Sequence, residues 1–142
     1  MIQNLNPFLN FNGTARKAMD HYCKVLGATV EAVMPWDPEM FEDGVPDEMK
    51  DGVMYAKLKV GEADLELSDM PPHLTADRGT NTHIILHVTD PTELDAAFKA
   101  LNEGGGEAEM PPEDMFWGAR YAKVRDRFGI SWALHCQIEQ PQ

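Results

Sequence analysis

The chain has 142 residues, a length that fits one domain with a sizeable buried core. Its composition, 43% hydrophobic and 25% charged, is typical of a globular soluble protein. A formal net charge of −12 argues against nucleic acid or an anionic membrane as partner, because long-range repulsion opposes both. No apolar run approaches the roughly 18 residues of a membrane span, and residues 1–4 lack the basic-then-apolar start of a secretory signal. We therefore expect a cytoplasmic protein.

The first half of the chain predicts a strand, a helix and three more strands. The helix is expected over residues 15–26, where apolar residues recur three and four positions apart. Thr14 precedes this helix as a candidate cap, and Gly27 can end it in the left-handed conformation. The strands are expected over residues 5–11, 29–34, 53–60 and 65–68.

The second half predicts the same order of elements. Asp90, Pro91 and Glu93 form the clearest helix start in the chain: a capping residue, a proline in the first turn and an acidic residue three positions after the cap. The helix ends before the glycines 104–106. The strands are expected over residues 82–88, 108–110, 119–125 and 130–136.

This repeat predicts the fold. Tyr55-Ala56-Lys57-Leu58 in the first half corresponds to Tyr121-Ala122-Lys123-Val124 in the second. We expect a single α+β domain over residues 1–142, in which two paired βαβββ modules form a curved mixed sheet with a cleft. The expected boundaries are module 1–69, linker 70–78 and module 79–138. Because a helix covers only one face of each sheet, the bare faces are expected to line the cleft.

A long acidic segment between two strands of the first module, residues 36–52, has no periodic pattern. One interpretation is a solvated excursion that keeps the protein soluble. The other is a lid over the cleft, with Trp36, Met40 and Phe41 as its apolar underside, because long loops inside compact domains are often functional.

The predicted bare faces carry aromatic and cationic side chains. Tyr55, Lys57, Tyr121 and Lys123 alternate with the apolar residues that the helices cover. In so acidic a chain, these residues predict binding of a polar or anionic small molecule, since lysine supplies charge and tyrosine supplies contact area. Alternatively, the lysines extend into solvent at the strand edges.

Phe116-Trp117-Gly118 lies between two predicted strands of the second module. Phe116 and Trp117 have three possible roles: packing at a sheet corner, lining the ligand pocket, or anchoring a protein interface. We assign both to the ligand-binding set. No phosphate-binding glycine loop, serine nucleophile elbow or cysteine–histidine pair at a recognisable spacing is present, so no catalytic residue is assigned.

Nearly the whole chain resembles the PhnB-like branch of the vicinal-oxygen-chelate superfamily, which includes glyoxalase I, bleomycin-resistance proteins and extradiol dioxygenases. The most specific matching motifs are Phe116-Trp117-Gly118 and Asp126-Arg127-Phe128-Gly129-Ile130-Ser131-Trp132. The runs from Asn6 to Gly27 and over Leu67-Ser68-Asp69 also match. The resemblance implies paired βαβββ modules and a homodimer.

The resemblance also places four metal-ligand positions, at Pro7, Glu66, His83 and Ala133. Two of these four residues can coordinate a metal through their side chains. We therefore favour a small-molecule binding protein with an incomplete metal site and no cofactor. The alternative is a lyase, isomerase or dioxygenase in which Glu66 and His83 hold Zn, Ni, Mn or Fe, with His87 or His135 completing the ligand set. Whether the chain is an enzyme stays open.

Overall fold

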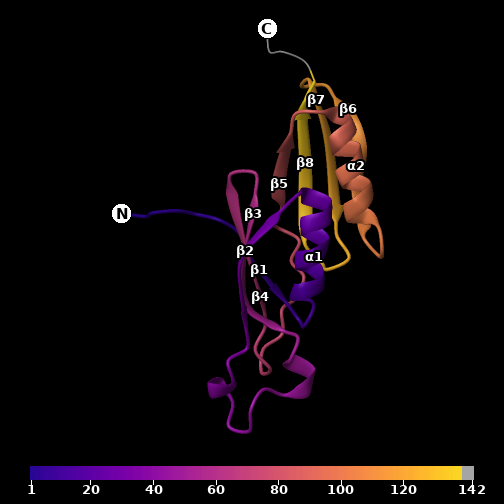
Figure 1. Cartoon of the computed structure of the whole chain (residues 1–142). Helices are drawn as coiled ribbons and strands as arrows, with labels where there is room; N and C mark the ends of the chain where they lie inside the picture. The colour runs from indigo at the N-terminus through magenta and orange to yellow at the C-terminus, as the bar shows by residue number, and fades with distance from the viewer. Residues whose placement is uncertain (139–142) are drawn as a thin grey trace. The chain divides into compact units, whose positions relative to one another are not determined.

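The computed structural model describes residues 1–138 and divides the chain into two compact units. The first unit runs from Met1 to Asp77, and the second begins at Arg78. Each unit contains one four-stranded sheet and one α-helix of 12 residues, in the order strand, helix, strand, strand, strand (Figure 1). The predicted α+β class and the two βαβββ modules are confirmed. No helix in the described part of the chain is long and apolar enough to cross a membrane.

In the first unit the strands lie in the order β1-β4-β3-β2. The pair β1 and β4 is parallel, and the two other neighbouring pairs are antiparallel. The connection from β2 to β3 contains two short 3₁₀ helices, η1 and η2. The bounds are β1 Phe8–Phe11, α1 Ala15–Leu26, β2 Thr29–Pro35, η1 Pro38–Met40, η2 Asp47–Met49, β3 Val53–Val60 and β4 Ala63–Asp69.

The second unit repeats this topology with the order β5-β8-β7-β6. Again the pair formed by the first and last strands, β5 and β8, is parallel, and the others are antiparallel. The bounds are β5 Ile84–Val88, α2 Pro91–Asn102, β6 Glu107–Met115, β7 Ala119–Arg125 and β8 Ser131–Gln137.

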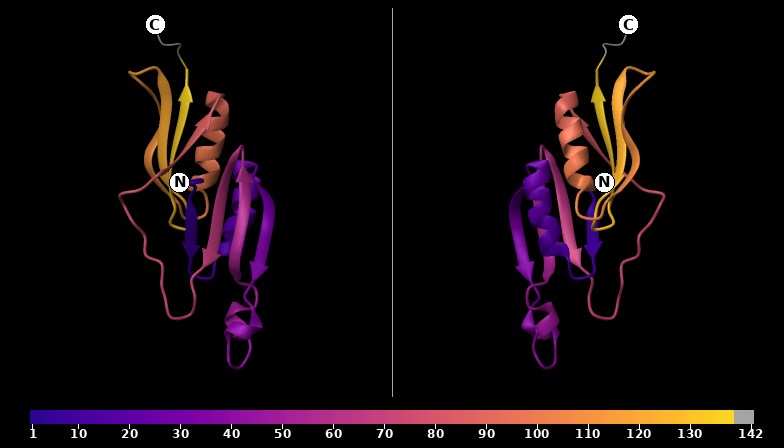
Figure 2. Two further views of the ribbon diagram at one scale, coloured as in Figure 1. Left: turned by 90° about the vertical axis from the view of Figure 1, so that its left-hand side faces the viewer. Right: turned by 90° about the vertical axis from the view of Figure 1, so that its right-hand side faces the viewer.

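In each unit the helix packs against one face of its own sheet (Figure 2). On β3 the covered face presents Ala56 and Leu58, and on β7 it presents Ala122 and Val124; all four residues are fully buried. The alternating residues of both strands are half-buried and lie on the opposite face, as the period-two pattern predicts. We call this opposite face, in each unit, the open face.

The start of α1 depends on a buried carboxylate from another element. Thr14 precedes α1 but makes no side-chain capping hydrogen bond, so the expected cap is wrong. Instead Asp69, at the end of β4, accepts hydrogen bonds from the backbone N–H groups of Ala15 and Val53, each at 2.9 Å. Its side chain therefore joins the helix to two neighbouring strands, which explains why a charged residue can be buried there.

The second unit also contains a buried aspartate with several donors. Asp126 follows β7 and accepts hydrogen bonds from the backbone N–H groups of Phe128 and Ile130 and from the Trp132 indole, at 2.9, 3.0 and 2.9 Å. These contacts hold the tight connection from β7 to β8. They give a physical reason for the aspartate and tryptophan in the motif that resembles the superfamily.

Strand β6 is longer than predicted. The expected strand covered residues 108–110, whereas β6 runs to Met115 through Pro111 and Pro112. Proline lacks the N–H that a central strand needs, but β6 is an edge strand, and its pairing with β7 is irregular between Met110 and Glu113. The longer strand places Phe116 and Trp117 in the turn that joins β6 to β7.

The acidic connection between β2 and β3 extends beyond the ends of the strands (Figure 1). Trp36 is buried there, with its ring edge-on to Phe41 at 6.2 Å between centroids. A Cβ atom on Gly52 would lie only 2.8 Å from Trp36 Nε1, so a side chain at this position would displace the indole. The Arg16 guanidinium also donates to the Asp51 carbonyl oxygen at 3.0 Å. The segment is thus built around a buried tryptophan and tied to α1.

Candidate functional site

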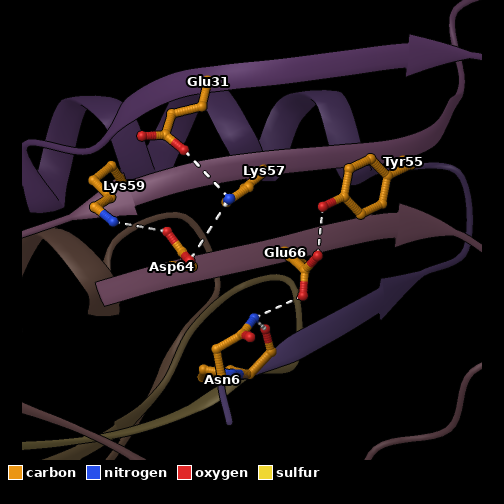
Figure 3. Close-up of polar contacts among 8 residues, drawn as sticks. Asn6, Glu31, Tyr55, Lys57, Lys59, Asp64 and Glu66 are labelled. Atoms are coloured by element: carbon orange, nitrogen blue, oxygen red, sulfur yellow. Dashed lines mark hydrogen bonds and ion pairs between the residues drawn. The ribbon is translucent and has the colours of Figure 1, made fainter. Parts of the chain in front are cut away.

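On the open face of the first unit, the Glu66 carboxylate is fully engaged (Figure 3). The Tyr55 hydroxyl donates a hydrogen bond to Oε1, and Asn6 Nδ2 donates to Oε2 at 2.7 Å. The hydrogen bond to Glu66 raises the pKa of Tyr55 to about 12. The same two donors, Tyr55 first, hold the pKa of Glu66 below its ordinary value. This cluster therefore favours an ionised carboxylate and a protonated phenol.

The lysines of this face lie among carboxylates. Lys57 Nζ is 3.7 Å from both Glu31 and Asp64, and Lys59 Nζ is 3.0 Å from Asp64 (Figure 3). The hydrogen bond between Lys59 and Asp64 is the main cause of two pKa shifts. It lowers the pKa of Asp64 and raises the pKa of Lys59. The predicted anion-binding residue Lys57 thus has two acidic neighbours within its own unit, which lowers its attraction for an anionic ligand.

The open face of the second unit carries a continuous row of rings. The register pairs His87 with His135 and His135 with Tyr121, across strands β5, β8 and β7. The ring centroids are 5.3 and 6.5 Å apart, and the row continues through Trp117, 5.9 Å from Tyr121, to Phe116, 5.1 Å further. All four contacts are edge-to-face, an arrangement that aromatic groups favour.

Phe116 and Trp117 are not core residues. The two residues are 97% and 51% exposed at the β6–β7 turn, so the interpretation as packing at a sheet corner is wrong. The structure places Trp117 beside Tyr121, which connects two of the predicted ligand-binding residues. Lys123 is half-buried on the same face, and no ion pair to it is found within residues 1–138.

The two predicted metal ligands each have their own partner. Glu66 is bound by Tyr55 and Asn6, and His83 Nε2 lies 3.3 Å from Glu109 Oε2 of β6. Within the described residues, no group of three or more histidine, cysteine, aspartate or glutamate side chains gathers as metal ligands would. The resemblance implies two further ligand positions, Pro7 and Ala133, and neither has a side-chain atom that can coordinate a metal.

Sequence reasoning missed two of these partners. Asn6 lies outside every strand. The backbone N–H of Glu66, on β4, donates to the carbonyl oxygen of Pro7, just before β1, and this hydrogen bond brings Asn6 next to Glu66. Glu109 lies at the irregularity in β6, where strict alternation fails. The pairing of His87 with His135 had a detectable signal, because each histidine alternates with apolar residues in its expected strand, as Tyr121 does in its own.

The chain matches a model of a known protein family. Residues 4–134 match the model described as Glyoxalase/Bleomycin resistance protein/Dioxygenase superfamily, so the chain belongs to that superfamily. The expectation drawn from the motifs is confirmed at this level.

Individual relatives agree. Protein PA1353 from Pseudomonas aeruginosa is 34% identical, with a TM-score of 0.81 and coverage of 96% of this chain and 98% of that one. Protein YjdN from Escherichia coli is 26% identical, over 96% of this chain and 97% of its own. The PhnB protein from Bacillus cereus, 20% identical, shares the fold with a TM-score of 0.74 over 94% of this chain and 99% of its own.

Proposed function

We propose that this chain is a small-molecule binding protein whose ligand is a planar, polar or anionic molecule. The observation that carries the proposal is the exposed row of rings on the second open face. In the proposed complex, Phe116, Trp117 and Tyr121 supply the contact surface and Lys123 supplies the opposite charge. On the open face of the first unit, Tyr55 and Lys57 are weaker candidates for ligand contact, because both are already engaged with carboxylates of that unit.

The exposure of the row supports this proposal. A half-exposed tryptophan beside a half-buried tyrosine offers a large apolar area at small conformational cost, and such side chains dominate binding sites. Lys123 has no acidic partner in residues 1–138, so its charge is available to a ligand, in contrast to Lys57. The site therefore favours a ring that bears a carboxylate, sulfonate or similar group.

The proposal does not require a metal ion at the superfamily positions. Pro7 and Ala133 have no side-chain atom that can coordinate a metal, so the four superfamily positions do not supply a complete ligand set. The alternative, a metal-dependent lyase, isomerase or dioxygenase using Glu66 and His83, is favoured by superfamily membership. Metal analysis of wild type and His83→Ala after exposure to Zn, Ni, Mn and Fe would support it if stoichiometric metal in wild type is lost in the variant.

The proposal is tested by titrating the full chain with 8-anilinonaphthalene-1-sulfonate, a planar aromatic anion. We expect saturable binding that Trp117→Ala weakens about tenfold, the equivalent of about 1.4 kcal/mol. Lys123→Ala should weaken binding and reduce its dependence on salt. Leu74→Ala is the matched control, because Leu74 is an exposed apolar residue of the linker, remote from the row in sequence. Equal affinity in Trp117→Ala, Tyr121→Ala and wild type would contradict the proposal.

A further inference from the structure

His87 and His135 form a pair with no structural task that the fold explains. They lie directly opposite each other on the parallel strands β5 and β8, on the open face of the second unit. Their ring centroids are 5.3 Å apart, with an angle of 65° between the ring planes. His87 is exposed and His135 is half-buried. Burial against the helix therefore does not account for either imidazole.

The ring nitrogens of this pair are available. Within residues 1–138, neither His87 nor His135 has a hydrogen-bond or ion-pair partner, whereas His83 lies against Glu109. The remaining neighbour in the row is Tyr121, whose ring lies 6.5 Å from that of His135. Lys123 and Arg125 follow Tyr121 at alternate positions of β7, so they share this face and oppose positive charge on it. The net charge of −12 acts in the other direction and attracts cations to the protein.

The spacing of the rings fits shared coordination of one ion. Zinc binds imidazole nitrogen at roughly 2.0–2.1 Å, and two imidazoles at a tetrahedral angle then have centroids roughly 5 Å apart. The observed 5.3 Å agrees with this geometry. The regular β5–β8 register holds the two residues side by side, so rotation of the side chains is the movement needed to turn one nitrogen of each ring toward a shared ion.

We propose that His87 and His135 form a two-imidazole site for a divalent ion that prefers nitrogen ligands, such as Zn, Ni or Cu. Water occupies the other coordination positions, since the described residues supply no third ligand of the usual types here. The site uses neither of the superfamily positions Glu66 and His83. It goes beyond the proposed binding function, which does not depend on it.

The test is isothermal titration calorimetry of the full chain with zinc chloride in a non-coordinating buffer, combined with ¹⁵N NMR of the histidine rings. We expect one ion per chain and shifts confined to the rings of His87 and His135. His87→Ala should weaken zinc binding by roughly 100-fold, since loss of even a supporting partner costs 10–100-fold. His87 is exposed, so this variant is expected to fold, and His135→Gln provides a second test.

Matched variants decide the outcome. His73→Ala removes an exposed histidine of the linker, and His83→Ala removes the predicted superfamily ligand; both should bind zinc as wild type does. Zinc binding that survives His87→Ala and His135→Gln overturns the proposal, as does binding that only His83→Ala abolishes. Several weak ions per chain, unaffected by any histidine variant, also overturn it. Titration with 8-anilinonaphthalene-1-sulfonate without zinc separates this outcome from failure of the proposed function.

Discussion

The open faces of the two units are built on one plan but are chemically different. The register pairs Phe8 with Glu66 in the first unit and Ile85 with Ala133 in the second, so Glu66 and Ala133 occupy corresponding positions. The carboxylate of Glu66 engages Tyr55. Alanine cannot engage the corresponding Tyr121, which instead contacts Trp117 and His135. One residue thus decides whether a tyrosine is used inside the unit or remains available to a ligand.

The histidine pair differs in the same way. Asn10 and Ser68 are opposite each other on β1 and β4, as His87 and His135 are on β5 and β8. The Ser68 hydroxyl lies 2.8 Å from the backbone carbonyl oxygens of both Met54 and Asp69, so its single hydrogen has an acceptor within its own unit. The first unit therefore satisfies its polar groups internally, whereas the second leaves rings and nitrogen atoms unsatisfied. This contrast is why we place the candidate site on the second unit.

The largest expected effect comes from removing the buried aspartate that supports each face. Asp69→Ala leaves two backbone N–H groups without an acceptor, and Asp126→Ala leaves two backbone donors and the Trp132 indole. Each substitution should lower the free energy of unfolding by about 3 kcal/mol. Urea denaturation followed by circular dichroism measures the loss. Asp43→Ala, at an exposed position, is the control, and a loss equal to that of the control would refute these roles.

The next largest effect is expected at Ala133, the residue that makes the second open face chemically different from the first. Ala133→Glu places a carboxylate opposite Lys123, so it should weaken binding of 8-anilinonaphthalene-1-sulfonate about tenfold. Ala133 is buried, and the larger side chain is expected to cost about 1–3 kcal/mol of stability. Ala133→Gln has the same size without the charge and should keep more of the affinity. Equal losses in the two variants would show that crowding, and not charge, matters.

A third prediction transfers the histidine pair to the other unit. The double variant Asn10→His/Ser68→His recreates the opposed imidazoles on β1 and β4. If strand register alone provides the zinc geometry, calorimetry should detect a second ion per chain. The single variant Ser68→His is the control and should bind one. Failure of the double variant, in a folded protein that still binds the first ion, would show that register is insufficient.

The smallest effect concerns the pH dependence of the first face. The pKa of Tyr55 is raised from 10.0 to about 12 by Glu66, so the folded state holds its proton more tightly than the unfolded state. The stabilising contribution is therefore complete below pH 10 and is lost as the pH rises toward 12. Glu66→Gln should shift the Tyr55 titration back toward its ordinary range, as read by phenolate absorbance. In Tyr55→Phe the Tyr55 step should disappear from the absorbance titration, which identifies that step. A Tyr55 titration that is unchanged in Glu66→Gln would disprove that Glu66 raises the pKa of Tyr55.

The sequence was informative where periodicity is local. The helix over residues 15–26 and the strand over 53–60 have the predicted bounds, because their apolar spacing sets both the element and its buried face. Residues 119–125 behave in the same way. From these patterns, the repeat and the open faces could be predicted together.

The parts that were missed depend on contacts between distant residues. Asp69 caps a helix that begins 54 positions earlier, and no local pattern indicates this. Strand β6 tolerates two prolines because it lies at a sheet edge, which becomes known only with the strand order. The contacts of Glu66 with Asn6 and of His83 with Glu109 likewise require a register that apolar spacing does not determine.

Each unit has one deeply buried indole, Trp36 in the first and Trp132 in the second. Since tryptophan emission changes when the ring enters water, each half contains its own optical marker of unfolding. Two variants, each keeping either Trp36 or Trp132 and each with Trp117 replaced by phenylalanine, would report the thermal unfolding of one half each. Coincident curves would mean that the halves unfold cooperatively, and separate curves would mean that a duplicated unit retained its ability to fold alone.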